Sequence, residues 1–385
     1  MQATIDLAVR LAGDLITIPS ESSDPVASDA DNPEDRVGAY LRRVCGEHRL
    51  QAEMQAVTAR RHNLVIRLPR PEAAKIVIAG HMDTVSARGM AEPFAAARRD
   101  GRLWGRGACD DKGPLAVALA CLLHVARTGC PYDVTLVATV DEECSLGGAA
   151  AYARETPPFD LAIALEPTSL RIVRAHKGVM RLSLETTGVS VHSSTPHLGS
   201  NAIAAMLPVL ADLQCLYMEK RDTTPRGKGE GTTLAVTTIR GGSSENIVPH
   251  RCIATLDVRL APGLSPNEVR HRIRACVGER AKITSLFTAG GIDTPCSLPL
   301  VRRLQAAIES EAGPLAAVTA PYATDCSLLA GRGPCVVWGP GDIAHAHKAD
   351  EHIEISQIER GCRILCRFLG GGSSTAEDGP PPQER

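Results

Sequence analysis

Short apolar runs alternate with an amphipathic stretch in the first part of the chain. The runs at 63–68, 74–79 and 133–140 are typical of buried strands, and residues 113–126 place leucines at helical spacing. This alternation is the feature that most constrains the fold, because strands separated by helices form layered sheets with largely parallel strands. We therefore expect an α/β fold built on a mostly parallel sheet.

The alternation changes near residue 177. From there to residue 291 the predicted order is strand, helix, strand, strand, helix, strand, which indicates an α+β domain of the ferredoxin-like kind. The α/β pattern then resumes, and 385 residues exceed the size at which single cores stop growing. The predicted division is a first domain at 1–176 and 292–369, an inserted domain at 177–291, and a disordered tail at 370–385.

Composition and charge argue against several classes of function. A net charge of −2 gives no electrostatic case for binding nucleic acid or an anionic membrane, and no apolar stretch is long enough for a transmembrane helix. The N-terminal segment carries acidic residues within its apolar stretch, so it predicts an amphipathic helix and not a signal peptide. Thirteen cysteines without zinc-ribbon spacing favour reduced thiols and a cytoplasmic location.

Acidic and histidine side chains follow several of the predicted strands. His81 and Asp83 come after the run at 74–79, and the stretch DEE, which contains Glu142 and Glu143, comes after the run at 133–140. Taken singly, such charges most often belong to solvated loops. In parallel sheets, however, ligands bind beyond the carboxyl ends of the strands, so these side chains are candidates for one shared site.

Three further residues extend this group. Asp110 precedes the predicted helix, where the helix dipole alone could favour it; Glu166 follows an apolar run; and His347 follows a glycine turn, with His345 as a rival. The candidate ligands are therefore His81, Asp110, Glu143, Glu166 and His347. Two histidines and three carboxylates suit two zinc ions bridged by one carboxylate, with Glu142 beside a ligand and available as a general base.

Eight stretches, in order and approximate spacing, resemble the di-zinc family of deacylases and exopeptidases. This family includes acetylornithine deacetylase, succinyl-diaminopimelate desuccinylase, aminoacylase and glutamate carboxypeptidase, and the resemblance is strongest to the acetylornithine deacetylase branch. The stretches are GHMDTV, GRGACDDKGPLA, DEECSLGG, EPTSLRIVRAHKG, VHSSTPHLGSNAI, GGSSENIVP, LDVRLAPG and GPGDIAHAHKADEHIEI. They extend over nearly the whole chain, from His81 to Glu351.

The resemblance implies a role for each candidate ligand. His81 and Glu166 would bind one zinc ion, Glu143 and His347 would bind the other, and Asp110 would bridge the two. The peptide bond from Asp110 to the next residue would be cis. Cobalt or manganese could replace zinc.

The resemblance also implies roles for five residues outside the ligand set. Asp83 would orient His81, and Glu142 would be the general base. His192, from the inserted domain, would stabilise the oxyanion across a dimer interface. Asn246 and Arg259 would bind the α-carboxylate of the substrate, although Arg259 could instead pair with a neighbouring aspartate of its own strand.

By this resemblance the first domain is a zinc-hydrolase catalytic domain and the inserted domain is a lid that also forms a homodimer. The implied reaction is hydrolysis of the amide bond of an N-acyl amino acid, with acetylornithine as the leading substrate. Asp-Asp-Lys-Gly at 110–113 is more typical of dipeptidases, so a zinc dipeptidase or carboxypeptidase of the same family remains an alternative. A non-catalytic binding relative is a further alternative.

Overall fold

The computed structural model describes residues 1–22, 32–218 and 231–370, which form two compact packing units. Unit 1 contains Met1–Val173, Pro295–Ala317 and the segment that begins at Leu329, and unit 2 contains Arg174–Thr294 and Val318–Leu328. The last of these segments packs with unit 2, whereas the sequence-based division assigns it to the first domain. The predicted disordered tail lies outside the described residues from residue 371 onwards.

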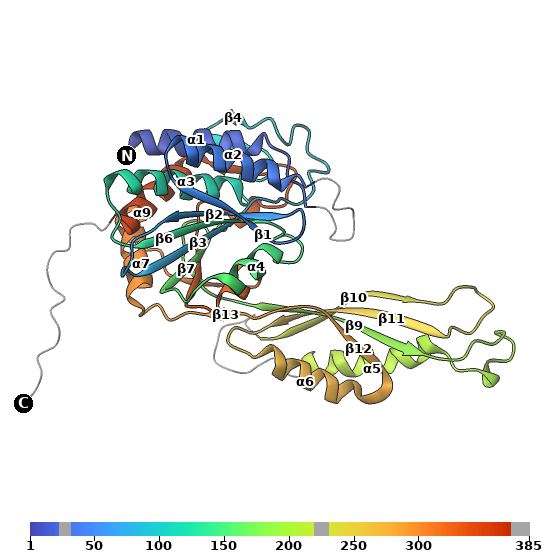
Figure 1. Cartoon of the computed structure of the whole chain (residues 1–385). Helices are drawn as coiled ribbons and strands as arrows, with labels where there is room; N and C mark the ends of the chain where they lie inside the picture. Colours follow the sequence, from blue (N-terminus) through green and yellow to red (C-terminus); the bar gives the residue numbers. More distant parts are fainter. Residues whose placement is uncertain (23–31, 219–230, 371–385) are drawn as a thin grey trace, which may run out of the picture. The chain divides into compact units, whose positions relative to one another are not determined.

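Unit 1 is built on a mostly parallel sheet, as the sequence predicts (Figure 1). Its strands, in sheet order, are β1 (Gln51–Ala56), β2 (His62–Leu68), β6 (Asp133–Thr139), β3 (Lys75–His81), β7 (Leu161–Ala164) and β15 (Cys335–Val337). Strand β3 runs parallel to both β6 and β7, and β15 runs parallel to β7, whereas β1 and β2 are antiparallel. A small antiparallel sheet contains β4 (Ala97–Arg99), β5 (Arg102–Trp104) and β16 (His352–Glu354).

Helices cover both faces of the unit 1 sheet (Figure 1). They are α1 (Gln2–Ile16), α2 (Glu34–Glu47), α3 (Lys112–Thr128), α4 (Gly147–Glu155), α7 (Pro299–Ala312) and α9 (Ile355–Leu369). Helices α1, α2 and α3 lie on one side and α4 on the other. Gly370 is the C-cap residue of α9.

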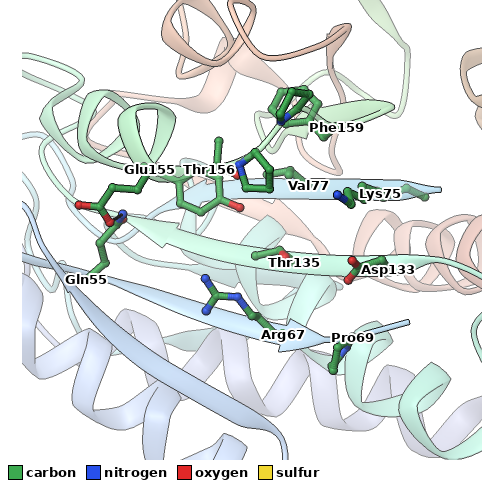
Figure 2. A pocket seen from close by; sticks show the side chains of 14 residues that line it. Gln55, Arg67, Pro69, Lys75, Val77, Asp133, Thr135, Glu155, Thr156 and Phe159 are labelled. Carbon is green, nitrogen blue, oxygen red and sulfur yellow. Dashed lines mark hydrogen bonds between the residues drawn. The ribbon is translucent and has the colours of Figure 1, made fainter. Parts of the chain in front are cut away.

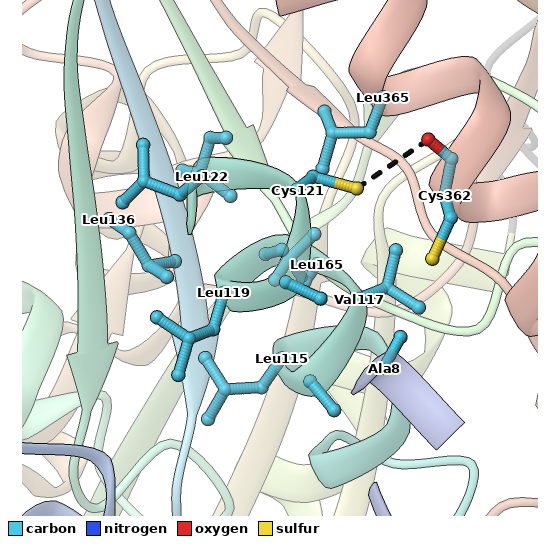
Figure 3. Close-up of a cluster of buried hydrophobic side chains, with 14 of the residues drawn as sticks. Ala8, Leu115, Val117, Leu119, Cys121, Leu122, Leu136, Leu165, Cys362 and Leu365 are labelled. Atoms are coloured by element: carbon cyan, nitrogen blue, oxygen red, sulfur yellow. Dashed lines mark hydrogen bonds between the residues drawn. The ribbon is translucent and has the colours of Figure 1, made fainter. Parts of the chain in front are cut away.

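Helix α3 lies at the centre of the unit 1 core. Sequence analysis places its leucines on one face, but the structure buries the helix almost all round because α1 and α9 pack against it as well as the sheet (Figure 3). The Cys121 thiol donates a hydrogen bond to the main-chain oxygen of Cys362 on α9, at 3.5 Å. A helix that is apolar on all sides is typical of a core position, and this one fixes the turn that precedes it.

Unit 2 has the predicted ferredoxin-like order of elements. They are β9 (Gly178–Thr187), α5 (Ala202–Met218), β10 (Thr233–Gly241), β11 (Arg251–Leu260), α6 (Pro266–Val277) and β12 (Lys282–Ala289). The four strands form an antiparallel sheet in the order β10–β11–β9–β12. Alternate residues of β11 are buried, and they pack with residues of both helices in a core separate from that of unit 1.

The remaining elements are short. Unit 2 also contains most of β8 (Val173–His176), the strands β13 (Ile292–Asp293) and β14 (Val318–Ala320), and most of α8 (Cys326–Leu329). Single 3₁₀ turns occur at Pro196–Leu198, Gly278–Arg280 and Ile343–His345. Within the described ranges, none of the helices combines the length and apolar character needed to cross a membrane.

Candidate metal centre

The parallel register of the unit 1 sheet brings three acidic or histidine segments to one edge. His81 is the last residue of β3 and pairs with Thr139 of β6, so the loop at 141–146 begins beside it. On the other side, Ala79 of β3 pairs with Ala164 of β7, which places Glu166 just beyond the same edge. The sequence-based expectation that these strand ends meet is therefore confirmed.

Asp110 lies at the centre of the cluster. Its Oδ1 is 2.9 Å from His81 Nε2, and its Oδ2 is 3.2 Å from His347 Nε2. The same His347 nitrogen is 3.2 Å from Glu143 Oε1.

Two potential ligand groups share Asp110. One is His81, Asp110 and Glu166, the other is Asp110, Glu143 and His347, and in each group the ligand atoms lie within 4.8 Å of one another. A carboxylate common to both groups has the arrangement expected of a bridging ligand. The peptide bond between Asp110 and Asp111 is cis, as expected.

Because these carboxylates are buried close to one another, a nearby cation would stabilise them. Glu166 is buried, and desolvation together with the charges of Asp110 and Glu142 raises the pKa of its carboxyl well above the usual range. The pKa of Asp110 is lowered: burial opposes this, but hydrogen bonds from His347 and His81 outweigh it. Imidazole nitrogens and carboxylate oxygens are zinc ligands, and a divalent ion would relieve the repulsion, so these residues fit the metal that the sequence predicts.

Neighbouring carboxylates raise the pKa of both candidate histidine ligands. Hydrogen bonds to Asp110 and Glu143 raise the pKa of His347 to about 10. The pKa of His81 is also raised well above its usual value, because hydrogen bonds to Asp110 and Asp83 outweigh the opposing effect of burial. A protonated imidazole must lose its proton before the same nitrogen can bind a metal ion.

Asp83 holds the loop that carries the predicted base. Its fully buried carboxylate accepts the backbone N–H groups of Glu142 and Glu143, each at 3.1 Å. His81 Nδ1 lies 2.9 Å from the main-chain oxygen of Asp83 and 3.5 Å from the carboxylate oxygen Oδ1. Asp83 therefore contacts both the candidate ligand His81 and the half-buried segment that contains Glu142.

His345, the rival of His347, belongs to neither ligand group. Its ring packs against that of His352 on β16, with the centroids 4.1 Å apart, while His352 also packs against Trp104. His347 itself has a backbone φ of 61°, a left-handed conformation that is uncommon for residues other than glycine. This local geometry separates the two side chains of the AHAH stretch.

Unit 2 carries the other three predicted residues. His192 and Asn246 are exposed and lie on adjacent loops: Ser193 N–H donates to the main-chain oxygen of Asn246 at 2.9 Å, and His192 forms a β-bridge with Ile247. His192 Nδ1 is 2.7 Å from Ser194 Oγ. The structure thus brings together two residues that are more than fifty positions apart in the sequence.

Arg259 lies on β11 and pairs with an aspartate of its own strand. Its Nε and Nη2 donate to the two carboxylate oxygens of Asp257, at 2.8 and 3.4 Å. This is the alternative that the sequence leaves open for Arg259. The side chain is 35% exposed, so it also has a surface that another anion could reach.

Sequence analysis does not single out several buried charged residues around the cluster. Glu351 and Arg106 form an ion pair beside Asp110, and Glu34 accepts the backbone N–H of Asp141 at 2.8 Å. Charged residues that fall inside or next to strand-like patterns, as Glu351 does directly before HIEI, are the signal that could have drawn attention to them.

A pocket in unit 1 is separate from this cluster (Figure 2). Lys75 and Asp133, the first residues of β3 and β6, line it together with Arg67 and Glu155. It therefore lies toward the amino ends of strands whose carboxyl ends carry the candidate ligands, and none of those ligands lines it. The chemistry of the side chains, and not the presence of a hollow, identifies the candidate site.

Comparison with known proteins places the chain in a family. The model of peptidase family M20/M25/M40 matches residues 77–370, and the chain belongs to this family. It is accordingly a metal-dependent hydrolase, as the resemblance in its motifs predicts.

Its curated relatives point to one branch. The chain is 31% identical over 384 residues to the acetylornithine deacetylase of Edwardsiella ictaluri, covering 96% of this chain and 98% of that protein. It is 30% identical over 381 residues to the acetylornithine deacetylase of Pectobacterium atrosepticum, with the same coverage.

Solved structures share the fold. A family M20 metallo-carboxypeptidase from Sulfolobus solfataricus aligns with a TM-score of 0.76 at 18% identity, covering 94% of this chain and 98% of that one. A dinuclear metal-binding peptidase of family M20 from Bacillus subtilis aligns with a TM-score of 0.70 at 15% identity, covering 96% and 98%.

Proposed function

We propose that this protein hydrolyses the amide bond of N-acyl amino acids, with N-acetylornithine as the first candidate substrate, and releases a carboxylic acid and a free amino acid. The observation that carries the proposal is the pair of ligand groups sharing Asp110. Relatives named acetylornithine deacetylase that match nearly the whole chain support the choice of substrate.

The proposed cofactor is a pair of zinc ions, which cobalt or manganese could replace. His81 and Glu166 would hold one ion, Glu143 and His347 the other, and Asp110 both. When bound, such ions supply a water-derived nucleophile near neutral pH and polarise the substrate carbonyl.

Glu142 is the proposed general base. Its carboxylate would take a proton from the nucleophilic water and return it to the leaving amine. Asp83 supports this role, because its carboxylate binds the backbone N–H groups of Glu142 and Glu143 and so fixes the start of the loop. His192 would donate a hydrogen bond to the developing oxyanion.

Asn246 and Arg259 are the proposed contacts to the α-carboxylate of the substrate. Arg259 has the planar, bidentate geometry that suits a carboxylate, and in the structure it already binds one, that of Asp257. A substrate carboxylate would compete with or extend this pair.

The proposed assembly is a homodimer formed through unit 2. Its exposed large apolar residues include Leu207 on α5 and Ile239 on β10, which is an edge strand of the sheet. An unpaired edge with apolar side chains favours pairing with a second chain. Val189, Leu198 and Ile247 add exposed apolar surface near the loops of His192 and Asn246.

The proposed location is the cytoplasm. All thirteen cysteines lie in the described part of the chain, and none of them forms a disulfide there. Proteins with many unpaired thiols are typical of reducing compartments.

A hydrolysis screen tests the proposed function. Zinc-loaded protein is assayed against N-acetylornithine, other N-acyl amino acids and dipeptides, with the Glu142→Gln variant as the control for contaminating activity. We expect turnover of N-acyl amino acids that the variant lacks. Turnover of dipeptides alone would show that the dipeptidase alternative is correct.

A further inference from the structure

We propose that Glu351 is a positioning residue for the metal centre: its carboxylate fixes the backbone of the turn that presents Asp110. Glu351 Oε1 accepts two consecutive backbone N–H groups, from Cys109 at 3.0 Å and from Asp110 at 3.2 Å. The side chain is 1% exposed, so these are buried, charge-assisted hydrogen bonds. This inference rests on the proposed metal centre.

The second oxygen of Glu351 binds a buried arginine. Arg106 Nη1 donates to Glu351 Oε2, and Arg106 Nη2 donates to the main-chain oxygen of Ser86 at 3.0 Å. Arg106 is 2% exposed, and the pair therefore has little competition from water. The pair joins the segment after β3, which follows His81, to the turn that carries Asp110.

Glu351 also connects the turn to the loop that carries His347. Its main-chain oxygen accepts the N–H of Gly105 at 3.1 Å, and it lies four residues after His347, directly before β16. The Cys109 thiol adds a contact to the main-chain oxygen of Asp342 at 3.3 Å. The segments of His81, Asp110 and His347 are therefore held to one another through Glu351 and its partners.

The arrangement parallels that of Asp83. Asp83 accepts the N–H groups of Glu142 and Glu143, and Glu351 accepts those of Cys109 and Asp110. In each case one buried carboxylate outside the ligand set binds two successive amides of a segment that supplies a ligand. Partners of this kind orient ligands, and their removal typically weakens metal binding by about 10- to 100-fold.

A matched pair of double variants tests this role. Removing Glu351 alone would leave Arg106 buried without its anion and could prevent folding. The pair is therefore Arg106→Met with Glu351→Gln, and Arg106→Met with Glu351→Met. Both lack the ion pair and the bond to Ser86, and only glutamine keeps a carbonyl oxygen for the two amides.

Zinc affinity of the metal-free proteins is measured by competition with a chromophoric chelator. We expect the methionine variant to bind zinc at least about tenfold more weakly than the glutamine variant. Hydrogen exchange of the peptide covering 105–111 should be faster in the methionine variant before any metal is added. Glu354→Gln, which removes an exposed ion pair between Glu354 on β16 and Arg102 on β5, should leave both quantities near those of the wild type.

Equal zinc affinity and equal exchange in the two double variants would overturn the proposal for Glu351 while leaving the metal centre intact. Failure of the wild-type protein to bind zinc would overturn the proposed centre, and the role of Glu351 with it. A difference in melting temperature that comes without a difference in zinc affinity would also count against the proposal, because it would show a purely structural role.

Discussion

Glu142 and Glu143 are neighbours in the sequence, but their side chains are expected to have different tasks. Glu143 Oε1 lies within 3.2 Å of His347 Nε2, whereas Glu142 is absent from both ligand groups. The backbone N–H groups of both residues donate to the carboxylate of Asp83. The same contact therefore anchors the backbone from which both side chains extend. One residue can therefore serve as a ligand while the other serves as a base.

Glu142→Gln should abolish most turnover without releasing metal. The substitution removes a proton acceptor but no ligand, and general bases typically contribute about 10²- to 10⁴-fold. The measurement is kcat for an N-acyl amino acid, together with the metal content of the purified variant. A kcat close to that of the wild type would show that Glu142 is not the base.

Zinc affinity should increase with pH. In the metal-free protein the pKa of His347 is raised to about 10, so near neutral pH this imidazole is protonated and the ion must displace the proton. Each displaced proton makes affinity rise by up to about tenfold per pH unit below the pKa. Chelator competition from about pH 6 to about pH 8 measures the slope, and calorimetry in two buffers measures the protons released.

No proton release and a flat profile would contradict this assignment. His347→Ala supplies the control, since it should reduce both the affinity and the number of protons released.

Arg259→Ala should affect a free-acid substrate much more than its amide. If Arg259 binds the α-carboxylate, either loss of the guanidinium or blocking of the carboxylate should lower kcat/KM by about 10²-fold. Applying both changes together should then add little. The measurement compares two enzymes against two substrates.

Additive losses in this comparison would mean that Arg259 serves only its partner Asp257. In the structure the carboxylate of Asp257 binds the guanidinium of Arg259, so a substrate carboxylate would compete with it for the same group. Asp257→Asn is a useful control because it removes the internal carboxylate charge without removing the arginine.

At the scale of elements, the segment between β15 and β16 separates His347 from His345, its rival in the sequence. The aromatic contact with His352 holds His345, and the left-handed backbone at His347 helps to place the second imidazole beside Asp110 and Glu143. The two histidines are two residues apart in the sequence, yet their side chains have different surroundings.

His347→Ala should lower the bound metal below about two ions per chain, whereas His345→Ala should leave it unchanged. The physical reason is that His347, and not His345, belongs to a ligand group, with its Nε2 3.2 Å from carboxylate oxygens of Asp110 and Glu143. Elemental analysis of the purified variants gives the result, and His81→Ala is the positive control. Metal loss in the His345 variant alone would reverse the choice.

At the scale of the whole molecule, each unit has its own core, and the apolar residues that remain exposed are concentrated in unit 2. Within the described residues, Val189, Leu198 and Leu207 are each more than half exposed, and all lie in this unit. Such residues have no role in the packing of unit 2 itself, which supports its proposed use as the dimer surface.

The full chain should have the mass of a dimer in light scattering, and Ile239→Lys should convert it to a monomer. Ile239 is 48% exposed on the edge strand β10, where a charge would oppose pairing with a second chain. Leu286→Lys, on the opposite edge strand β12, is the matched control and should remain dimeric. A wild-type monomer with full activity would exclude a role for His192 across an interface.

The sequence by itself determined the class of fold, the order of elements in the inserted domain and the inventory of candidate ligands. Strand periodicity, the apolar helix and the βαββαβ order are local patterns. Such patterns can be recognised without knowing how the elements pack. The strand-end argument could bring His81, Glu143 and Glu166 together because parallel register follows from that topology. The helix start and the glycine turn added Asp110 and His347 as candidates, and the motif resemblance assigned their roles.

Only the tertiary structure decided which buried charges support that site. Glu351 is more than two hundred residues from the amides it binds, and Glu34 is 107 residues from Asp141, whose N–H it accepts. A hydrogen bond between distant segments leaves no periodic signal in either one. For the same reason, the choice of Arg259 between Asp257 and a substrate, and the contact of Arg106 with Ser86, depend on side-chain geometry that spacing cannot specify.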